Sequence, residues 1–214
     1  MDFDFIIRSI PRYIDAAFVT LYLSFCGIII SIIVGFLCSL IIYFKVKILS
    51  TIVNIYIELS RNTPLLIQIA LLHFGLKFEA TTSAIIGLAF LGGSYMAEAF
   101  RSGLESVEKI QIESALSIGL TKFQLILYIL LPQALVLSVP ALGANIIFLI
   151  KESSVVYIVA LADLVFLTKD IIGSVYKTNE ALFLLVVAYL VILLPISFLI
   201  TFIEKKVRFA SFGN

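Results

Sequence analysis

Long stretches without a charged side chain restrict the possible folds of this chain more than any other feature. The three largest gaps between charged residues are 16–44, 123–150 and 181–203, and two shorter gaps are 80–97 and 62–76. A bilayer core about 30 Å thick requires roughly 20 apolar residues per helix, and four of these gaps reach or nearly reach that length. Because 62% of the residues are hydrophobic and the mean hydropathy is +1.16, we predict a polytopic membrane protein.

The charge-free gaps predict an all-α membrane protein with about five transmembrane helices, preceded by a short interfacial helix. The interfacial helix is expected over the first residues, where apolar and charged side chains occupy opposite faces, with a break or kink at Pro11. The predicted spans are residues 17–44, 53–76, 80–100, 123–150 and 181–203. Because no internal repeat or linker is found, residues 1–214 are expected to form a single transmembrane domain.

Span 1 contains small residues at helical spacing. Gly27, Ser31 and Gly35 are four residues apart, a pattern that allows a second helix to pack closely. Cys26 and Cys38 are too far apart on one helix to form a disulfide, so both are interpreted as small apolar residues.

Spans 2 and 4 contain residues that interrupt a helix. In span 2, Pro64 lacks an N–H group and suits the first turn of a helix, with Thr63 or Asn62 as its cap. Irregular backbone at that depth must face protein or a water-filled cavity, because lipid cannot satisfy it. In span 4, Pro132 and Pro140 predict kinks or a break.

The composition also excludes several kinds of site. The net charge of +1 and the dispersed basic residues offer no nucleic-acid surface. His73 is the only histidine, and no cysteine or second histidine lies near it to complete a metal site. Neither a metal nor a cofactor is therefore expected, and a membrane-embedded enzyme is a poor interpretation.

The basic residues in the loops predict an orientation. In a five-span arrangement, one side of the membrane receives nine basic residues and the other receives six. Because loops rich in Lys and Arg remain cytoplasmic, the N-terminus is expected outside and the C-terminus in the cytoplasm. The loop 101–122, between spans 3 and 4, is then cytoplasmic.

This loop contains the pattern of a short amphipathic helix. Its apolar face is marked by residues at i, i+3, i+4 and i+7, namely Ile112, Ala115, Leu116 and Gly119. Gly119 is well placed to end the helix. Two interpretations fit the pattern: a helix that docks into a groove on a partner, or a surface helix that covers its own bundle.

The loop also resembles the signature of a known family. The run Glu113-Ser-Ala-x3-Gly119, then nine residues and Ile129-x-Leu131-Pro132, is similar to the Glu-Ala-Ala-x3-Gly-x9-Ile-x-Leu-Pro loop of bacterial ABC-importer permeases. Residues 58–68, 95–107 and 151–155 resemble three further stretches of the polar amino-acid uptake branch, typified by Arg-Gly-Thr-Pro-Leu-Leu-x-Gln, Ala-Glu-x-x-Arg-Gly-Gly-x-x-Ser-Val and Lys-Asp-Thr-Ser-Leu. The resemblance covers roughly residues 15 to 205, with the four motifs in the correct order.

Three positions depart from the family pattern. Ser114 replaces the second alanine of the loop and, being small, is expected to leave docking intact. Asn62 replaces a glycine, and asparagine tolerates a left-handed backbone almost as well. Ser102 replaces the first glycine after Arg101, and the sequence offers no interpretation of that change.

The resemblance implies a transport subunit of the bacterial inner membrane that performs no covalent chemistry. Its implied partners are a second permease chain, identical or related, an ATP-binding cassette ATPase dimer in the cytoplasm, and an extracytoplasmic solute-binding protein. The segment with Glu113, Ser114, Ala115 and Gly119 would enter a cleft on the ATPase and transmit its movement. No Gly-x4-Gly-Lys-Ser/Thr phosphate loop occurs in the chain, so the nucleotide site is expected on another polypeptide.

Polar residues inside the spans are candidates for contact with an amino-acid zwitterion. The candidates for the substrate pathway are Arg61, Thr63, Gln68, Glu98 and Asn145. Each has a structural alternative: Glu98 and Arg101 are spaced as an intrahelical ion pair, and Gln68 and Asn145 could form interhelical hydrogen bonds. The alternative function is a self-sufficient channel or ion-coupled secondary transporter for small polar solutes, for which internal repeats are expected.

Overall fold

The protein is helical throughout the part of the chain described by its structure, a computed structural model covering residues 1–212. The helices are α1 (Phe3–Tyr43), α2 (Lys47–Arg61), α3 (Leu65–Ala70), α4 (Ala80–Glu105), α5 (Lys109–Ser117), α6 (Lys122–Leu125), α7 (Leu131–Glu152), α8 (Leu164–Val175) and α9 (Thr178–Phe212). Two π-helical turns, η1 (Leu71–Gly75) and η2 (Ile126–Leu130), and a 3-10 turn, η3 (Ser153–Val159), join them. The predicted all-α membrane class is confirmed.

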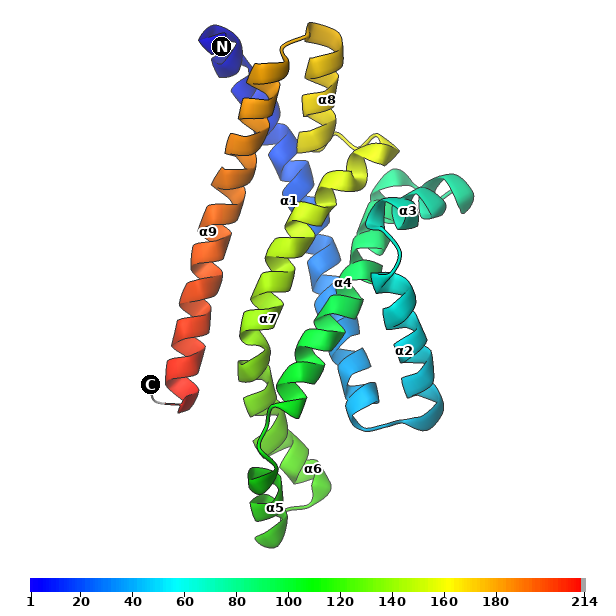
Figure 1. The fold of residues 1–214 in the computed structure, drawn as a ribbon, viewed down its shortest axis with the longest axis vertical. Helices are drawn as coiled ribbons and strands as arrows, with labels where there is room; N and C mark the ends of the chain where they lie inside the picture. The colour runs from blue at the N-terminus through cyan, green and yellow to red at the C-terminus, as the bar shows by residue number, and fades with distance from the viewer. Residues whose placement is uncertain (213–214) are drawn as a thin grey trace.

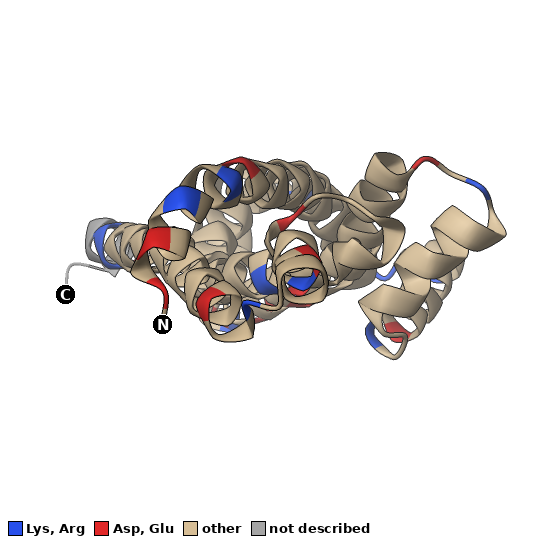
Figure 2. Ribbon diagram, turned by 90° about the horizontal axis from the view of Figure 1, so that it is seen from above, with Lys and Arg blue, Asp and Glu red and all other residues tan. Residues whose placement is uncertain are grey.

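Four helical segments are long and apolar enough to cross a bilayer. They are Phe3–Tyr43, Ala80–Glu105, Lys122–Val159 and Thr178–Val207. The second predicted span differs, because α2 and the shorter apolar segment Leu65–Gly75 divide it into two pieces. Figure 1 shows that α2 turns back beside the lower end of α1 and that α3 lies beyond the upper end of α2. In Figure 2 the charged residues are isolated segments on largely uncharged helices.

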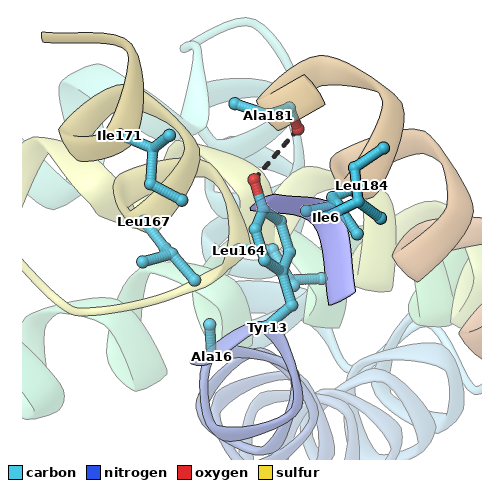
Figure 3. Close-up of a cluster of buried hydrophobic side chains, with 8 residues drawn as sticks. All are labelled: Ile6, Tyr13, Ala16, Leu164, Leu167, Ile171, Ala181 and Leu184. Atoms are coloured by element: carbon cyan, nitrogen blue, oxygen red, sulfur yellow. Dashed lines mark hydrogen bonds between the residues drawn. The ribbon is translucent and has the colours of Figure 1, made fainter. Parts of the chain in front are cut away.

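The short interfacial helix expected before residue 17 is not a separate element. Instead α1 is a single helix of 41 residues that continues through Pro11. Tertiary contacts hold its first turns: Ile6, Tyr13 and Ala16 are buried in one apolar cluster with residues of α8 and α9 (Figure 3). The hydroxyl of Tyr13 also donates a hydrogen bond of 2.9 Å to the backbone carbonyl of Ala181. These contacts explain why residues 3–16 pack into the bundle rather than lying apart in the interface.

The small residues of span 1 pack against α4, as their spacing predicts. A Cβ atom added at Gly27 would lie 2.7 Å from the Cβ of Leu88, and one at Gly35 would collide with Met96. The hydroxyl of Ser31, which lies between them, donates a hydrogen bond to the Gly27 carbonyl. The backbones of α1 and α4 can therefore approach each other closely because Gly27, Ser31 and Gly35 lack large side chains.

The prolines of span 4 produce a local change rather than a break. The helix continues from Lys122 to Val159, but it contains a π-helical turn, η2, immediately before α7 begins at Leu131. Pro132 lies in the first turn of α7, and the π-helical turn before it changes the hydrogen-bond spacing next to the residue that lacks an N–H. Pro140 lies inside α7, which continues past it.

Candidate functional site

The helix predicted in the loop after span 3 is α5, and it ends where Gly119 was expected to end it. Gly119 has a φ of +87°. Its N–H bonds the Leu116 carbonyl at 3.0 Å, and the N–H of Leu120 bonds the Ala115 carbonyl at 3.2 Å. This pair of bonds is the Schellman arrangement, which requires a left-handed residue at the glycine position. Figure 1 shows α5 at the end of the molecule opposite the N-terminus.

The two interpretations of this helix apply to different residues on it. Ala115 is buried, and Ile112 packs against the apolar cluster that contains Leu104 and Leu130. Leu116 is 46% exposed and Ile118 is 80% exposed. One face of α5 therefore covers its own bundle, while its tip leaves two large apolar side chains uncovered.

A shallow groove lies between α5 and the helix formed by η2 and the start of α7. Its volume is about 380 Å³. It is lined by Ile110, Gln111, Ser114, Ala115, Ile118, Leu120, Ile129 and Gln133. Ser114, the departure from the family alanine, lies in this groove, while Glu113 is exposed beside it.

The break between α2 and α3 is held by the side chain of Gln68. This side chain is 8% exposed, and its Nε2 donates to the carbonyls of Ser60 at 3.0 Å and Thr63 at 2.9 Å. Its Oε1 is buried without a partner in the described part of the chain. Thr63 and Gln68 also line an apolar hollow of about 290 Å³ between α3 and α4.

The expected cap of the helix after Pro64 is wrong. Pro64 itself occupies the cap position of α3 and makes no side-chain cap bond. Asn62 turns back instead, and its Nδ2 donates to the Glu58 carbonyl at 2.7 Å, so it closes the end of α2. Asn62 has a φ of −93°, so the turn needs no left-handed residue and the family's glycine is dispensable there.

Two of the predicted pathway residues meet at Tyr95, on α4. The guanidinium of Arg61 lies 5.2 Å from the centroid of the Tyr95 ring, a cation–π distance. From α7, the Nδ2 of Asn145 donates to the Tyr95 carbonyl at 3.1 Å. Glu98 follows Tyr95 by three residues on α4, so both residues lie on the same side of that helix.

Glu98 and Arg101 form the intrahelical ion pair that their spacing predicts. The guanidinium of Arg101 bonds Glu98 at 2.7 Å and also bonds Glu105 at 2.8 Å. The structural interpretation of Asn145 is likewise confirmed, because its amide links α7 to α4. Tyr95 was not among the predicted site residues, although it begins the family-like stretch 95–107 and precedes Glu98 by three residues.

The two glycine positions after Arg101 in the family motif have different requirements here. Ser102 is exposed, so a side chain is accommodated there. A Cβ at Gly103 would lie 2.5 Å from the carbonyl oxygen of Ala134 and would collide with Ser138. Only the second position therefore requires glycine for close packing of α4 on α7.

No metal site is visible in the described residues. No group of three or more His, Cys, Asp or Glu side chains there could hold an ion. The Nδ1 of His73, in η1, instead lies 2.9 Å from the carbonyl of Phe78, in the loop that follows η1.

The fold is that of a multi-pass membrane protein, with polar groups between its helices and a short helix at one end. Residues 8–209 match the family described as the binding-protein-dependent transport system inner membrane component, and the chain belongs to this family. It is therefore a multi-pass inner-membrane permease subunit, and the ATPase activity of such importers lies in separate subunits. Membership also implies a solute-binding protein and a second permease as partners.

Curated relatives agree with this assignment. The chain is 33% identical over 213 residues to the probable amino-acid permease protein YxeN of Bacillus subtilis (strain 168), covering 96% of this chain and 95% of that protein. It is 38% identical over 156 residues to the probable glutamine ABC transporter permease protein GlnP of the same strain, covering 71% and 72%. The glutamine transport system permease protein GlnP of Escherichia coli (strain K12) is 29% identical over 217 residues, covering 97% and 99%.

Solved structures show the same fold. The crystal structure of an amino acid ABC transporter with histidines has a TM-score of 0.89 at 31% identity and covers 96% of this chain and 99% of its own. An inward-facing form of the MetNI methionine ABC transporter has a TM-score of 0.77 at 20% identity, covers 94% and 98%, and shows the fold alone. Together these findings support the importer subunit and give no support to a self-sufficient channel or ion-coupled carrier.

Proposed function

We propose that this chain is the permease subunit of an ATP-driven amino-acid importer and forms the translocation pathway with a second permease chain. The observation that carries the proposal is α5, a helix closed by Gly119 that leaves Leu116 and Ile118 uncovered at one end of the bundle. The named relatives are amino-acid and glutamine permeases, which supports amino acids as the substrate class. In this proposal residues 1–214 act as one transmembrane domain.

The coupling role is assigned to Glu113, Ser114, Ala115 and Gly119, which contribute in different ways. Ser114 and the exposed Glu113 lie where an ATPase can touch them. Ala115 is buried and anchors α5 to its own bundle, while Gly119 sets the turn that ends the helix. Closure of an ATPase dimer would therefore push on α5 and move the helices packed against it as rigid bodies.

The opposite end of the bundle is assigned to the solute-binding protein. That end carries the N-terminus and α8 (Figure 1), and the loop charges favour an extracytoplasmic N-terminus and a cytoplasmic C-terminus. This orientation places α5, and with it the ATPase contact, on the cytoplasmic side.

The substrate pathway is assigned to two parts of the structure. Arg61 and Asn145 meet at Tyr95, and Glu98 follows on the same side of α4, so a polar solute would find both donors and a carboxylate there. Thr63 and Gln68 shape the break between α2 and α3, where irregular backbone requires protein or water as its neighbour.

Reconstitution tests the function directly. The chain is co-expressed with a candidate ATPase and binding protein, and nucleotide-dependent uptake of radiolabelled L-amino acids is measured in proteoliposomes. Failure to form a complex, or uptake driven by an ion gradient without nucleotide, would overturn the proposal.

The coupling role has its own variant and control. Gly119→Val is expected to leave ATP hydrolysis in place while reducing uptake, because a β-branched residue resists a φ of +87°. Gly119→Asn tolerates that φ and should transport nearly normally. A Cβ at this position would meet nothing within 4 Å inside the chain, so an internal clash cannot explain a difference between the variants. Unaltered coupling in Gly119→Val would contradict the role of the turn.

A further inference from the structure

Helix α2 has three distinct faces, and only one of them is covered by the rest of the chain. The buried face carries Val53, Ile57 and Ser60. A second, exposed face is apolar and carries Ile48, Ile52, Ile55 and Leu59, all more than half exposed. A third, exposed face is polar and carries Lys47, Thr51, Asn54, Glu58 and Arg61. At 100° per residue, each set occupies about a third of the helix circumference.

The two exposed faces suit different surroundings. The apolar face matches lipid. The polar face has residues at intervals of four, three, four and three along the whole helix, including the charged Glu58 and Arg61. Charged side chains at membrane depth are costly in lipid and face a water-filled cavity or a partner group.

The depth of this polar face fits a pathway through the membrane. Glu58 follows Lys47 by eleven residues, and a helix rises about 16 Å over that length, roughly half of a bilayer core. At the end of α2, Arg61 lies over the ring of Tyr95, so the polar face of α2 contacts α4 there. The break between α2 and α3 follows immediately.

Glu58 and Arg61 form no ion pair with any other described residue, unlike the charges on α4 that follow Tyr95. Arg101, by contrast, bonds both Glu98 and Glu105, and so its charge is locally balanced. The only side-chain bond to the Glu58 carboxylate in the described structure comes from the Nδ2 of Asn62, at 3.0 Å. One anion and one cation, three residues apart on an exposed helix face, are therefore available to a ligand.

We propose that Glu58 and Arg61 form a zwitterion site on a water-lined face of α2, in which Glu58 receives the ammonium group of an amino acid and Arg61 its carboxylate. The planar guanidinium suits a carboxylate, which it binds through two parallel hydrogen bonds. The ring of Tyr95 restrains the guanidinium from behind. This inference rests on the proposed importer function. It names the two charged side chains that bind the ammonium and carboxylate groups of its substrate.

The first experiment tests which face meets water. Cysteines are introduced in the membrane-embedded complex after Cys26 and Cys38 are replaced by alanine, and reaction with a charged, membrane-impermeant methanethiosulfonate is timed. Thr51→Cys and Asn54→Cys should react at least about tenfold faster than Ile52→Cys and Ile55→Cys, since thiolates form in water and not in lipid. Equal rates would overturn the proposal. Slow labelling at 51 and 54 with disulfide cross-linking between two chains would instead make this face a chain contact, which also overturns it.

The second experiment tests the charges. Nucleotide-dependent uptake of an equimolar mixture of radiolabelled L-amino acids is measured in proteoliposomes for Glu58→Gln and Arg61→Gln. Glutamine can still accept the hydrogen bond from Asn62, so Glu58→Gln removes the charge and keeps the contact. Each variant should lose about tenfold in uptake at limiting substrate, the effect of losing one charge-assisted contact.

Two controls make the result specific. Arg61→Lys keeps the charge and should retain most of the uptake. Lys47→Gln removes a positive charge from the same face at its far end and should remain within about twofold of the unmodified chain, because separated charges are screened in water. If Glu58→Gln and Arg61→Gln transport normally, or if Lys47→Gln loses as much, the zwitterion site is wrong while the importer function stands. If the unmodified complex takes up no amino acid, the proposed function fails and the site fails with it.

Discussion

The hydroxyl of Tyr13, on the first long helix, donates a 2.9 Å hydrogen bond to the backbone carbonyl of Ala181, on the last one. The same hydroxyl lies 3.0 Å from the Oγ1 of Thr168 on α8, so a single side chain joins three helices. Tyr13 is 4% exposed, and apolar residues of all three helices surround it (Figure 3). The end of the bundle that carries the N-terminus is therefore a packed core and not a set of loose helix ends.

Removing this hydroxyl should destabilise that end of the bundle. Tyr13→Phe keeps the ring but leaves the Ala181 carbonyl without this donor, at an expected cost of about 1–2 kcal/mol. Tyr22→Phe is the control, because Tyr22 is 56% exposed on the same helix. Thermal unfolding of the purified protein in detergent measures both variants. Equal stability of the two would show that the buried hydrogen bond contributes nothing.

Acid should loosen the same end through Asp2. The N–H of Phe5 bonds the Asp2 carboxylate, as does the ammonium of Lys177 at 3.0 Å, and these contacts lower the pKa of Asp2. A carboxyl whose pKa is lowered in the folded state stabilises the fold above its unfolded pKa of about 3.9, and loses that contribution as the pH falls through the folded value. The pKa of Lys177 is raised by the same pair, so its contribution is lost only in strong alkali.

Asp2→Asn isolates this effect, because asparagine can still cap α1 while carrying no charge. Between pH 5 and pH 3 the unmodified chain should lose thermal stability more steeply than Asp2→Asn. Glu180, which accepts the N–H of Asp2 at 2.8 Å, is present in both proteins, so its titration cancels in the comparison. Parallel pH profiles would show that the Asp2 charge is not linked to folding.

Two glycines should respond to alanine with opposite signs. Gly103→Ala inserts a methyl group against Ser138 and the Ala134 carbonyl, and overpacking of this kind costs about 1–3 kcal/mol. At Gly173, on α8, nothing lies within 4 Å of the added atom, so Gly173→Ala should stabilise by up to about 1 kcal/mol through helix propensity. Chemical denaturation in detergent compares the two. A stabilising Gly103→Ala would mean that α4 and α7 can separate without cost.

Much of this fold was predictable, because lipid leaves a helix few alternatives. Charge-free length alone located α1, α4, α7 and α9, since backbone polar groups must be satisfied within each segment. Gly119 was predictable for a similarly local reason, because the end of a helix selects a residue that tolerates positive φ. The spacing of Glu98 and Arg101 gave their ion pair.

The remaining features depend on contacts distant in sequence. The continuity of α1 through Pro11 is supported by Tyr13 and by an ion pair between Arg12 and Asp170 on α8, neither of which a local pattern reveals. Tyr95 carries no charge and stands out only because Arg61 and Asn145 come to it from other helices. Local rules therefore place the helices, and tertiary contacts decide which of their polar residues meet.

Gln68 should be essential to the geometry of the break between α2 and α3. Its Nε2 bonds the carbonyls of Ser60 and Thr63 and thereby fixes the end of α2 relative to the start of α3. Gln68→Met preserves the length and buried volume of the side chain but leaves both carbonyls without this donor. With about 0.5–1.5 kcal/mol per hydrogen bond, the expected loss is roughly 1–3 kcal/mol.

The adjacent Ile67 provides the control, because it is 52% exposed and Ile67→Met removes no polar contact. Amide hydrogen exchange over residues 62–70 reports the break locally, alongside thermal unfolding of the whole chain. Gln68→Met should exchange faster in this segment and transport less, whereas Ile67→Met should match the unmodified protein. Unchanged exchange in Gln68→Met would mean that packing of Leu65 and Ile69, both buried against α4, holds the break without the amide.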